Sequence, residues 1–218
     1  MSICYLNGKF LDLKEAKISP LDRGFLFGDA IYEVIASYNN KPFKIEDHLD
    51  RLFINLKDIK ISVNYSRQEV KNILESVIEK NDLSNQIIYL QISRGHEDIR
   101  DHIPGPSPSP TIFVCSFPLK NIPNAQTTSI KASLKKDFRW RKSNIKSTSL
   151  LANVMYKIQA SEEDFFEIIL QENGYITEGA VSNVFCVKNN EVKTPSLENN
   201  ILPGITRSVI IDIVNKIG

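Results

Sequence analysis

The sequence has few residues that could crosslink the fold or bind a metal. Only three of its 218 residues are cysteines, and Cys4, Cys115 and Cys186 are too widely spaced for a disulfide framework or a CxxC metal site. Each lies in an apolar, strand-like run, so we expect three reduced core residues. The three histidines also lack the paired spacing of metal ligands, and we therefore expect no metal.

The sequence also lacks an excess of charge of one sign and any long apolar run. Lys and Arg total 27 against 26 for Asp and Glu, so the net charge of +1 provides no basic field to hold nucleic acid or an anionic membrane surface. No stretch approaches the roughly 20 apolar residues of a membrane span, and the first ten residues do not resemble a signal peptide. We expect a cytoplasmic protein that binds neither nucleic acid nor membrane.

The composition, 42% hydrophobic and 24% charged, is that of a folded protein with a core. Asn7-Gly8 favours a tight hairpin, and Ser66 with Glu69 has the spacing of a capping box. Strands and helices do not alternate strictly, which indicates an α+β or mixed α/β fold. We expect two domains, residues 1–118 and 119–218, joined by a passage over 118–126. The pattern predicts strands over 3–6, 9–11, 30–38, 86–93, 111–117, 165–171 and 182–187, and helices over 45–59, from Ser66, over 149–162 and over 208–216.

A basic helix face and a helix start in the sequence could each bind an anion. His48 and Arg51 share a face of the predicted helix over 45–59, beside its apolar stripe, although a solvated helix face would look the same. A Pro-Gly pair precedes Ile205 and Thr206, at a helix start whose unpaired amides and dipole favour phosphate. The alternative there is an ordinary Pro/Gly turn with Thr206 as the N-cap.

A lysine and a carboxylate stand where polar segments meet apolar ones. Lys146 lies where a polar loop enters the core, so desolvation could make its neutral amine a nucleophile. Arg139, Arg141 and Lys142 crowd the same loop, and a solvated basic loop is the simpler interpretation. Glu178 follows a predicted strand, where a buried carboxylate can meet a ligand; the alternative is a surface turn.

Arg100 and His102 form an R-x-H pair in an irregular segment rich in glycine and proline. Alternate residues of an extended loop face the same side, so both could bind one carboxylate, with the arginine supplying a bidentate fork. Mutual pairing with Glu97, Asp98 and Asp101 is the alternative.

Five segments, taken in order, resemble the class IV aminotransferases, which include D-amino-acid aminotransferases, branched-chain aminotransferases and aminodeoxychorismate lyases. The resemblance implies fold-type IV, with two domains and the cofactor pyridoxal 5'-phosphate between them. The segments are ISPLDRGFLFGDAIYEVI at 18–35, DHLDRL at 47–52, IKSTSLLANV at 145–154, ITEGAVSNVF at 176–185 and ILPGITR at 201–207.

The resemblance implies a role for each candidate around the cofactor. Lys146 matches the catalytic lysine that binds the cofactor covalently and moves the Cα proton, and Glu178 matches the carboxylate that pairs with the pyridine nitrogen. Tyr32 matches an active-site tyrosine.

The phosphate group and the ring face have their own matches. Arg51 matches the arginine that binds the phosphate, and Ile205 and Thr206 match the helix start whose amides hold it. Leu202 matches the apolar residue behind the ring.

Within the family, Arg100 and His102 resemble the carboxylate trap of D-amino-acid aminotransferases, contributed with Tyr32 across a dimer interface. This implies a homodimer that transfers the amino group of a D-amino acid to a 2-oxo acid, of the D-alanine and 2-oxoglutarate type. A branched-chain aminotransferase or an aminodeoxychorismate lyase is the alternative. Relatives continue beyond Gly218, so we also expect a C-terminally truncated second domain, and a truncated inactive homologue stays open.

Overall fold

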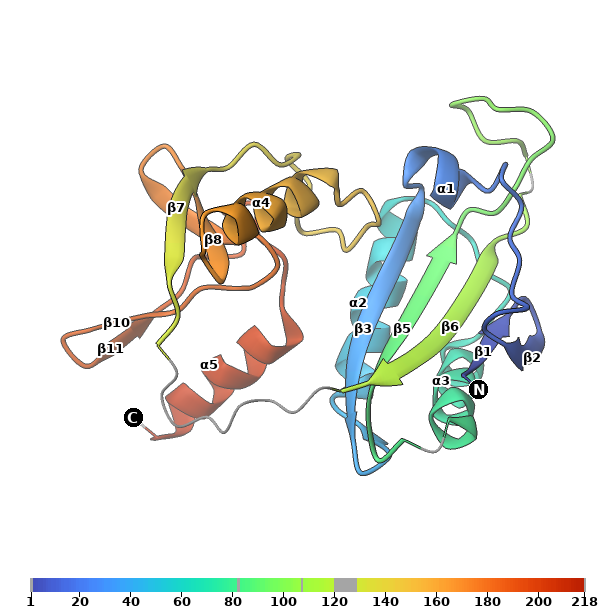
Figure 1. Cartoon of the computed structure of the whole chain (residues 1–218), viewed down its shortest axis with the longest axis horizontal. Coiled ribbons are helices and arrows are strands. Elements are labelled where there is room, and N and C mark those ends of the chain that lie inside the picture. The colour runs from blue at the N-terminus through green and yellow to red at the C-terminus, as the bar shows by residue number, and fades with distance from the viewer. Residues whose placement is uncertain (1, 82, 107, 120–128, 218) are drawn as a thin grey trace. The chain divides into compact units, whose positions relative to one another are not determined.

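A computed structural model of the chain describes residues 2–81, 83–106, 108–119 and 129–217 (Figure 1). The chain divides into a first unit, Met1–Ile122 with Lys146–Ser149, and a second unit, Pro123–Ile145 with Leu150–Gly218. The expectation that all of 119–218 forms one domain is therefore wrong for Lys146–Ser149. Its backbone is hydrogen-bonded to a strand of the first unit. Most of the predicted passage over 118–126 lies outside the described residues.

The first unit is built on a six-stranded antiparallel sheet with the strand order β2-β1-β6-β5-β3-β4. The predicted hairpin is present, with Asn7 at φ 45° and Gly8 at φ 91° in its turn. The six strands are β1 (Ile3–Leu6), β2 (Lys9–Asp12), β3 (Ala30–Tyr38), β4 (Lys41–Pro42), β5 (Asn85–Ser93) and β6 (Thr111–Pro118).

Two helices, α2 (Ile45–Asp58) and α3 (Arg67–Lys80), pack on the sheet and bury one of its faces (Figure 1). Alternate residues of β5, such as Ile88 and Leu90, are fully buried, as period-2 patterning requires. The capping box predicted at Ser66 and Glu69 is confirmed. This layer of helices on a sheet is the core of the first unit.

A short helix, α1 (Arg23–Phe27), was missed by the sequence patterns because five residues show no periodicity. The Asp22 side chain caps it by accepting from the Gly24 N–H at 2.8 Å. It ends at Gly28 with φ 65°, where an added Cβ would lie 2.6 Å from Ser149 Oγ. The left-handed backbone at Gly28 therefore favours glycine at this turn.

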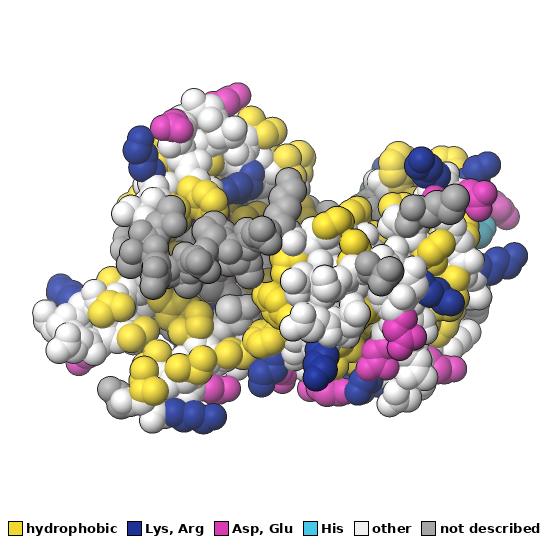
Figure 2. Space-filling model, turned by 60° about the horizontal axis from the view of Figure 1, so that its bottom comes forward, with side chains coloured by type: hydrophobic (Ala, Val, Ile, Leu, Met, Phe, Trp, Pro, Cys, Tyr) yellow, Lys and Arg dark blue, Asp and Glu magenta, His cyan; other side chains and the backbone are white. Residues whose placement is uncertain are grey.

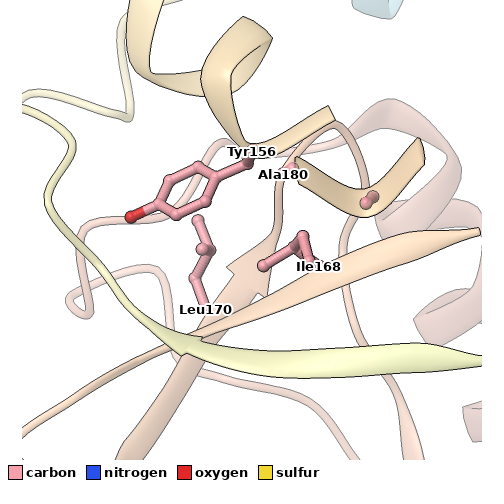
Figure 3. Packing of buried hydrophobic residues seen from close by; sticks show 5 residues of the cluster. Tyr156, Ile168, Leu170 and Ala180 are labelled. Atoms are coloured by element: carbon pink, nitrogen blue, oxygen red, sulfur yellow. The ribbon is translucent and has the colours of Figure 1, made fainter. Parts of the chain in front are cut away.

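The second unit contains a three-stranded sheet covered by a helix. Strand β7 (Ala132–Lys136) pairs in parallel with β8 (Glu167–Glu172), which forms a hairpin with β9 (Tyr175–Gly179). Helix α4 (Leu151–Glu162) contributes Tyr156 to a cluster with Ile168, Leu170 and Ala180 (Figure 3). The Tyr156 hydroxyl donates to the Lys136 carbonyl at 2.7 Å, so even the polar tip of this core residue is satisfied.

The rest of the second unit is a small hairpin, β10 (Cys186–Lys188) with β11 (Glu191–Lys193), followed by helix α5 (Ile205–Ile217). The strand predicted over 182–187 is wrong in its first part, because the Gly179 N–H bonds to the Ser182 carbonyl in a turn. Cys186 is exposed, which corrects the expectation of three core cysteines, whereas Cys4 and Cys115 are buried.

Helix α5 has no buried residue, and its Ile213 and Ile217 are exposed. In the space-filling view, basic and acidic side chains are interspersed with hydrophobic ones on the face shown (Figure 2). Within the described part of the chain, no helix is both long enough and apolar enough to cross a membrane.

Candidate active site

The structure brings Lys146 and Tyr32 together, although they are far apart in the sequence. The Tyr32 N–H donates to the Lys146 carbonyl at 3.0 Å, and the Thr148 N–H donates to the Ala30 carbonyl at 3.1 Å, so the lysine segment runs along β3. The Lys146 Nζ atom lies 4.3 Å from the centre of the Tyr32 ring. An ammonium over an aromatic face at this distance makes a cation–π contact.

Tyr32 also contacts a residue of the neighbouring strand of the sheet. Its ring stacks on Tyr89 of β5, with centres 5.7 Å apart. Burial raises the pKa of Tyr32, and the negative charge of the adjacent Glu33 raises it further, while Arg51 acts in the opposite direction. The phenol therefore keeps its proton at neutral pH and can donate a hydrogen bond.

Arg51 lies inside the first unit, so a solvated helix face is the wrong interpretation for it. Its Nε and Nη2 atoms donate to the Glu33 carboxylate at 2.8 and 2.6 Å, and His48 Nδ1 lies 2.7 Å from the same carboxylate. Burial alone would raise the pKa of Glu33, but the hydrogen bonds and charges of Arg51 and His48 outweigh it and lower that pKa. This fork sets the plane of the Arg51 guanidinium.

Glu178 is buried in β9, which rules out the surface-turn interpretation. Its carboxylate accepts from Arg139 Nη1, from Asn183 Nδ2 at 2.9 Å and from the Leu202 N–H at 3.1 Å. Burial raises the pKa of Glu178 against the opposing effect of Arg139. The side chain is thus fixed in position by three donors from three different segments.

Arg139 contacts the candidate site residue Glu178, and the sequence patterns did not single it out. Its guanidinium bridges two buried carboxylates, donating to Asp137 through Nε at 3.0 Å and Nη2 at 2.8 Å and to Glu178 through Nη1. Thr177 Oγ1 donates to Asp137 at 2.8 Å and completes the network. The available signal was the Asp-x-Arg spacing directly after β7, but the neighbouring basic residues concealed it.

The backbone of Leu202 is fixed on both sides beside Glu178. Asn183 Nδ2 donates to the Leu202 carbonyl at 3.1 Å while also donating to Glu178. An added Cβ at Gly204 would lie 2.0 Å from Asn183 Oδ1, so a side chain there would displace the Asn183 amide. The network thereby sets the turn that leads into α5.

Helix α5 begins at Ile205, so Thr206 lies in its first turn and is not the N-cap. The first N–H groups of an α-helix have no partner within the helix, and the dipole places partial positive charge there. Ile205 and Thr206 carry the first of these N–H groups in α5.

Arg100 and His102 meet at one aromatic ring. The Arg100 guanidinium lies 4.7 Å from the centre of the Phe27 ring, and the His102 ring lies 5.3 Å from it. Among the described residues, no ion pair joins Arg100 to the acidic side chains of its own loop, since Glu97 pairs with Arg23. Both members of the pair are exposed, which a role in binding requires.

Comparison with known proteins identifies the family. The family described as amino-transferase class IV matches residues 30–218. The chain belongs to the class IV aminotransferases. The D-alanine aminotransferase of Listeria monocytogenes is 33% identical over 98% of this chain and 74% of its own length. That of Bacillus licheniformis is 35% identical over 97% and 75%.

Solved structures of other aminotransferases have the same fold. The branched-chain amino acid aminotransferase from Escherichia coli superposes with a TM-score of 0.87 over 100% of this chain and 74% of that one, at 25% identity. Another branched-chain amino acid aminotransferase, solved with pyridoxamine 5'-phosphate, gives 0.89 over 99% and 74%, at 20% identity. The class IV fold, α+β with mixed helix and sheet, is thus confirmed for this aminotransferase.

Proposed function

We propose that this aminotransferase uses pyridoxal 5'-phosphate to transfer the amino group of a D-amino acid to a 2-oxo acid. The observation that supports the D-amino acid is the convergence of Arg100 and His102 on Phe27, which places a guanidinium fork and an imidazole at one exposed spot. The relatives named D-alanine aminotransferase, at 33 to 36% identity, favour the same substrate class.

The residues present fit the cofactor group by group. An amine at Lys146 suits its aldehyde, the buried carboxylate of Glu178 suits its ring nitrogen, and Arg51 with the start of α5 suits its phosphate. A side chain at Gly204 would displace the Asn183 amide, which donates both to Glu178 and to the Leu202 carbonyl.

Each of the chain's own residues then has a separate role in the reaction. The bound cofactor supplies a ring that accepts the electrons released when the substrate Cα loses its proton. Lys146 Nζ moves that proton, and Glu178 holds a proton at the ring nitrogen. Leu202 packs behind the ring, and Tyr32, protonated at neutral pH, donates a hydrogen bond in the site.

The substrate carboxylate is bound by Arg100 and His102 of a partner subunit, in a homodimer with shared active sites. A loop that contributes these residues across an interface needs to be exposed in a single chain, as this one is. The cytoplasmic location stays a prediction from the sequence.

A branched-chain aminotransferase is the second candidate, because solved structures of branched-chain amino acid aminotransferases superpose on this chain. An inactive homologue is less well supported, since Lys146, Glu178 and Arg51 are all present and fixed in position.

A panel of D- and L-amino acids distinguishes the candidates. The protein loaded with pyridoxal 5'-phosphate is mixed with each amino acid, and the loss of the cofactor's visible absorbance is followed. D-alanine and other D-amino acids should react, and L-leucine, L-isoleucine and L-valine should not. Reaction with the L-branched set alone would establish the second candidate, and no reaction with any member would establish an inactive protein.

A further inference from the structure

Arg23 of α1 is buried, and none of the roles proposed above involves it. Its Nε atom donates to Asp29 Oδ2 at 3.0 Å, and its Nη1 atom donates to Glu97 Oε2 at 3.0 Å. Two carboxylates thus balance the charge of a side chain that is 6% exposed. Those ion pairs account for its charge but not for its remaining hydrogen bonds.

The remaining hydrogen bonds of Arg23 go to the backbone of the recognition segment, which we define as residues 96–106. Nη1 donates to the Asp101 carbonyl at 2.6 Å, and Nη2 donates to the His102 carbonyl at 3.0 Å. One planar guanidinium therefore holds the two peptide groups on either side of His102. Because the fork is rigid, it sets both carbonyl positions together.

Helix α1 also contacts the side chains of this segment. Phe27 follows Arg23 by one helical turn, and the Arg23 guanidinium lies 4.9 Å from the centre of its ring. The same ring meets Arg100 at 4.7 Å and His102 at 5.3 Å. Arg23 thus holds the backbone at Asp101 and His102, and Phe27 contacts the side chains of Arg100 and His102.

The helix is itself fixed to the sheet. The Asp22 carboxylate that caps α1 also accepts from Ser93 Oγ at 3.0 Å and from Thr111 Oγ1 at 2.7 Å, at the ends of β5 and β6. The Arg23 N–H donates to the Gly95 carbonyl at 2.8 Å. Helix α1 therefore links the ends of β5 and β6 to the recognition segment.

We propose that Arg23 is a positioning residue for recognition of the substrate carboxylate: its two carbonyl hydrogen bonds hold the recognition segment so that Arg100 and His102 present their donors together. This inference rests on the proposed function, in which that pair binds the carboxylate. Arg23 itself does not touch the substrate. Its loss should therefore change substrate binding and leave cofactor binding unchanged.

The chain offers a matched control in Arg94. Its Nε and Nη2 atoms donate to the same Asp29 at 2.7 and 2.9 Å, and its other hydrogen bonds go to the carbonyls of Ile59 and Lys60. Arg94→Lys disturbs the same carboxylate without removing a hydrogen bond from the recognition segment. Arg23→Lys keeps the charge beside Asp29 and Glu97 but loses the fork.

Two measurements on the full chain test the proposal. Hydrogen exchange in the protein without substrate should be faster over 96–106 in Arg23→Lys and unchanged there in Arg94→Lys. KM for the reactive D-amino acid should rise about tenfold in Arg23→Lys, with kcat changed less and cofactor affinity unchanged. Phe27→Leu, which leaves the Arg23 hydrogen bonds in place, should raise KM without the change in exchange.

Unchanged exchange in Arg23→Lys would overturn the positioning role, and so would an equal rise of KM in Arg94→Lys. A loosened segment with a normal KM would overturn the link to substrate binding. Arg100→Ala separates the two proposals: a normal KM in that variant refutes the carboxylate role of Arg100, and the exchange data still decide whether Arg23 holds the segment.

Discussion

The guanidinium of Arg51 and the carboxylate of Glu33 form a bidentate ion pair in which the two side chains are 8% and 1% exposed. Glu33 is adjacent to Tyr32 on β3, and their side chains point to opposite faces of the sheet. One strand therefore carries the tyrosine of the proposed site on one face and the support of the proposed phosphate ligand on the other.

The ion pair makes the stability of the protein depend on pH in the acid range. The pKa of Glu33 is below its ordinary value of 4.5, so its stabilising contribution is complete above pH 4.5 and is lost as the pH falls through the lower folded value. Glu33→Gln leaves Arg51 as a buried charge without this carboxylate and should cost about 3 to 5 kcal/mol at neutral pH.

Urea unfolding at a series of pH values measures this effect. The difference between wild type and Glu33→Gln should be constant above pH 4.5 and shrink below it. Glu46→Gln, which alters an exposed ion pair on α2, is the control and should change stability little. A difference that grows on acidification would contradict the prediction.

Arg51 should bind the cofactor phosphate, but Arg51→Ala alone would also strand the Glu33 carboxylate. The double variant Glu33→Gln, Arg51→Met removes both charges, so it should fold better than either single variant. Its affinity for pyridoxal 5'-phosphate should fall by about 1.5 to 3 kcal/mol relative to wild type, the range for hydrogen bonds to charged groups. Wild-type affinity in a fluorescence titration would exclude Arg51 from phosphate binding.

Lys146→Ala should abolish transamination while the protein stays folded, because the proton of the substrate Cα then has no amine to accept it. The visible absorbance of the bound cofactor should shift to that of the non-covalent form. Lys142→Ala is the matched control, since this exposed lysine of the same loop should be dispensable. An unaltered spectrum in Lys146→Ala would show that another lysine binds the cofactor.

Arg139→Met should destabilise the second unit, because Asp137 and Glu178 would remain as buried carboxylates without their shared partner. The cost of such a loss is about 3 to 5 kcal/mol. Arg141 lies in the same segment as Arg139, is exposed and pairs with Glu172, so it provides the comparison. Arg141→Met should be nearly neutral. Equal unfolding midpoints for the two variants would refute the structural role of Arg139.

The sequence predicted the elements whose patterns are strong. The β-branched and aromatic residues of Ala30–Tyr38, the apolar stripe of α2 and the capping box of α3 each specify an element locally, and the structure confirms all three. The short α1 and the polar strand β7 carry too little periodicity to be recognised. These elements owe their conformation to partners elsewhere in the chain.

The residues of the candidate site could be predicted from the sequence, but their contacts with one another could not. The resemblance selected Lys146 and Tyr32, but no local pattern shows that one segment pairs with the strand of the other. Arg139 was obscured because a basic run looks solvated unless its buried carboxylate partners are known. Long-range pairing of charges is a property of the tertiary fold, and single-sequence patterns do not contain it.

Because Lys146–Ser149 belongs to the first unit, that unit is completed only after part of the second unit has been synthesised. During synthesis from the N-terminus, Met1–Ile122 leaves the ribosome before the four residues that complete its strand edge. A gene fragment ending at Ile122 would lack its lysine, and a fragment starting at Pro123 would carry that lysine without the strand that holds it. Neither unit can therefore be expressed whole as one uninterrupted piece of the chain.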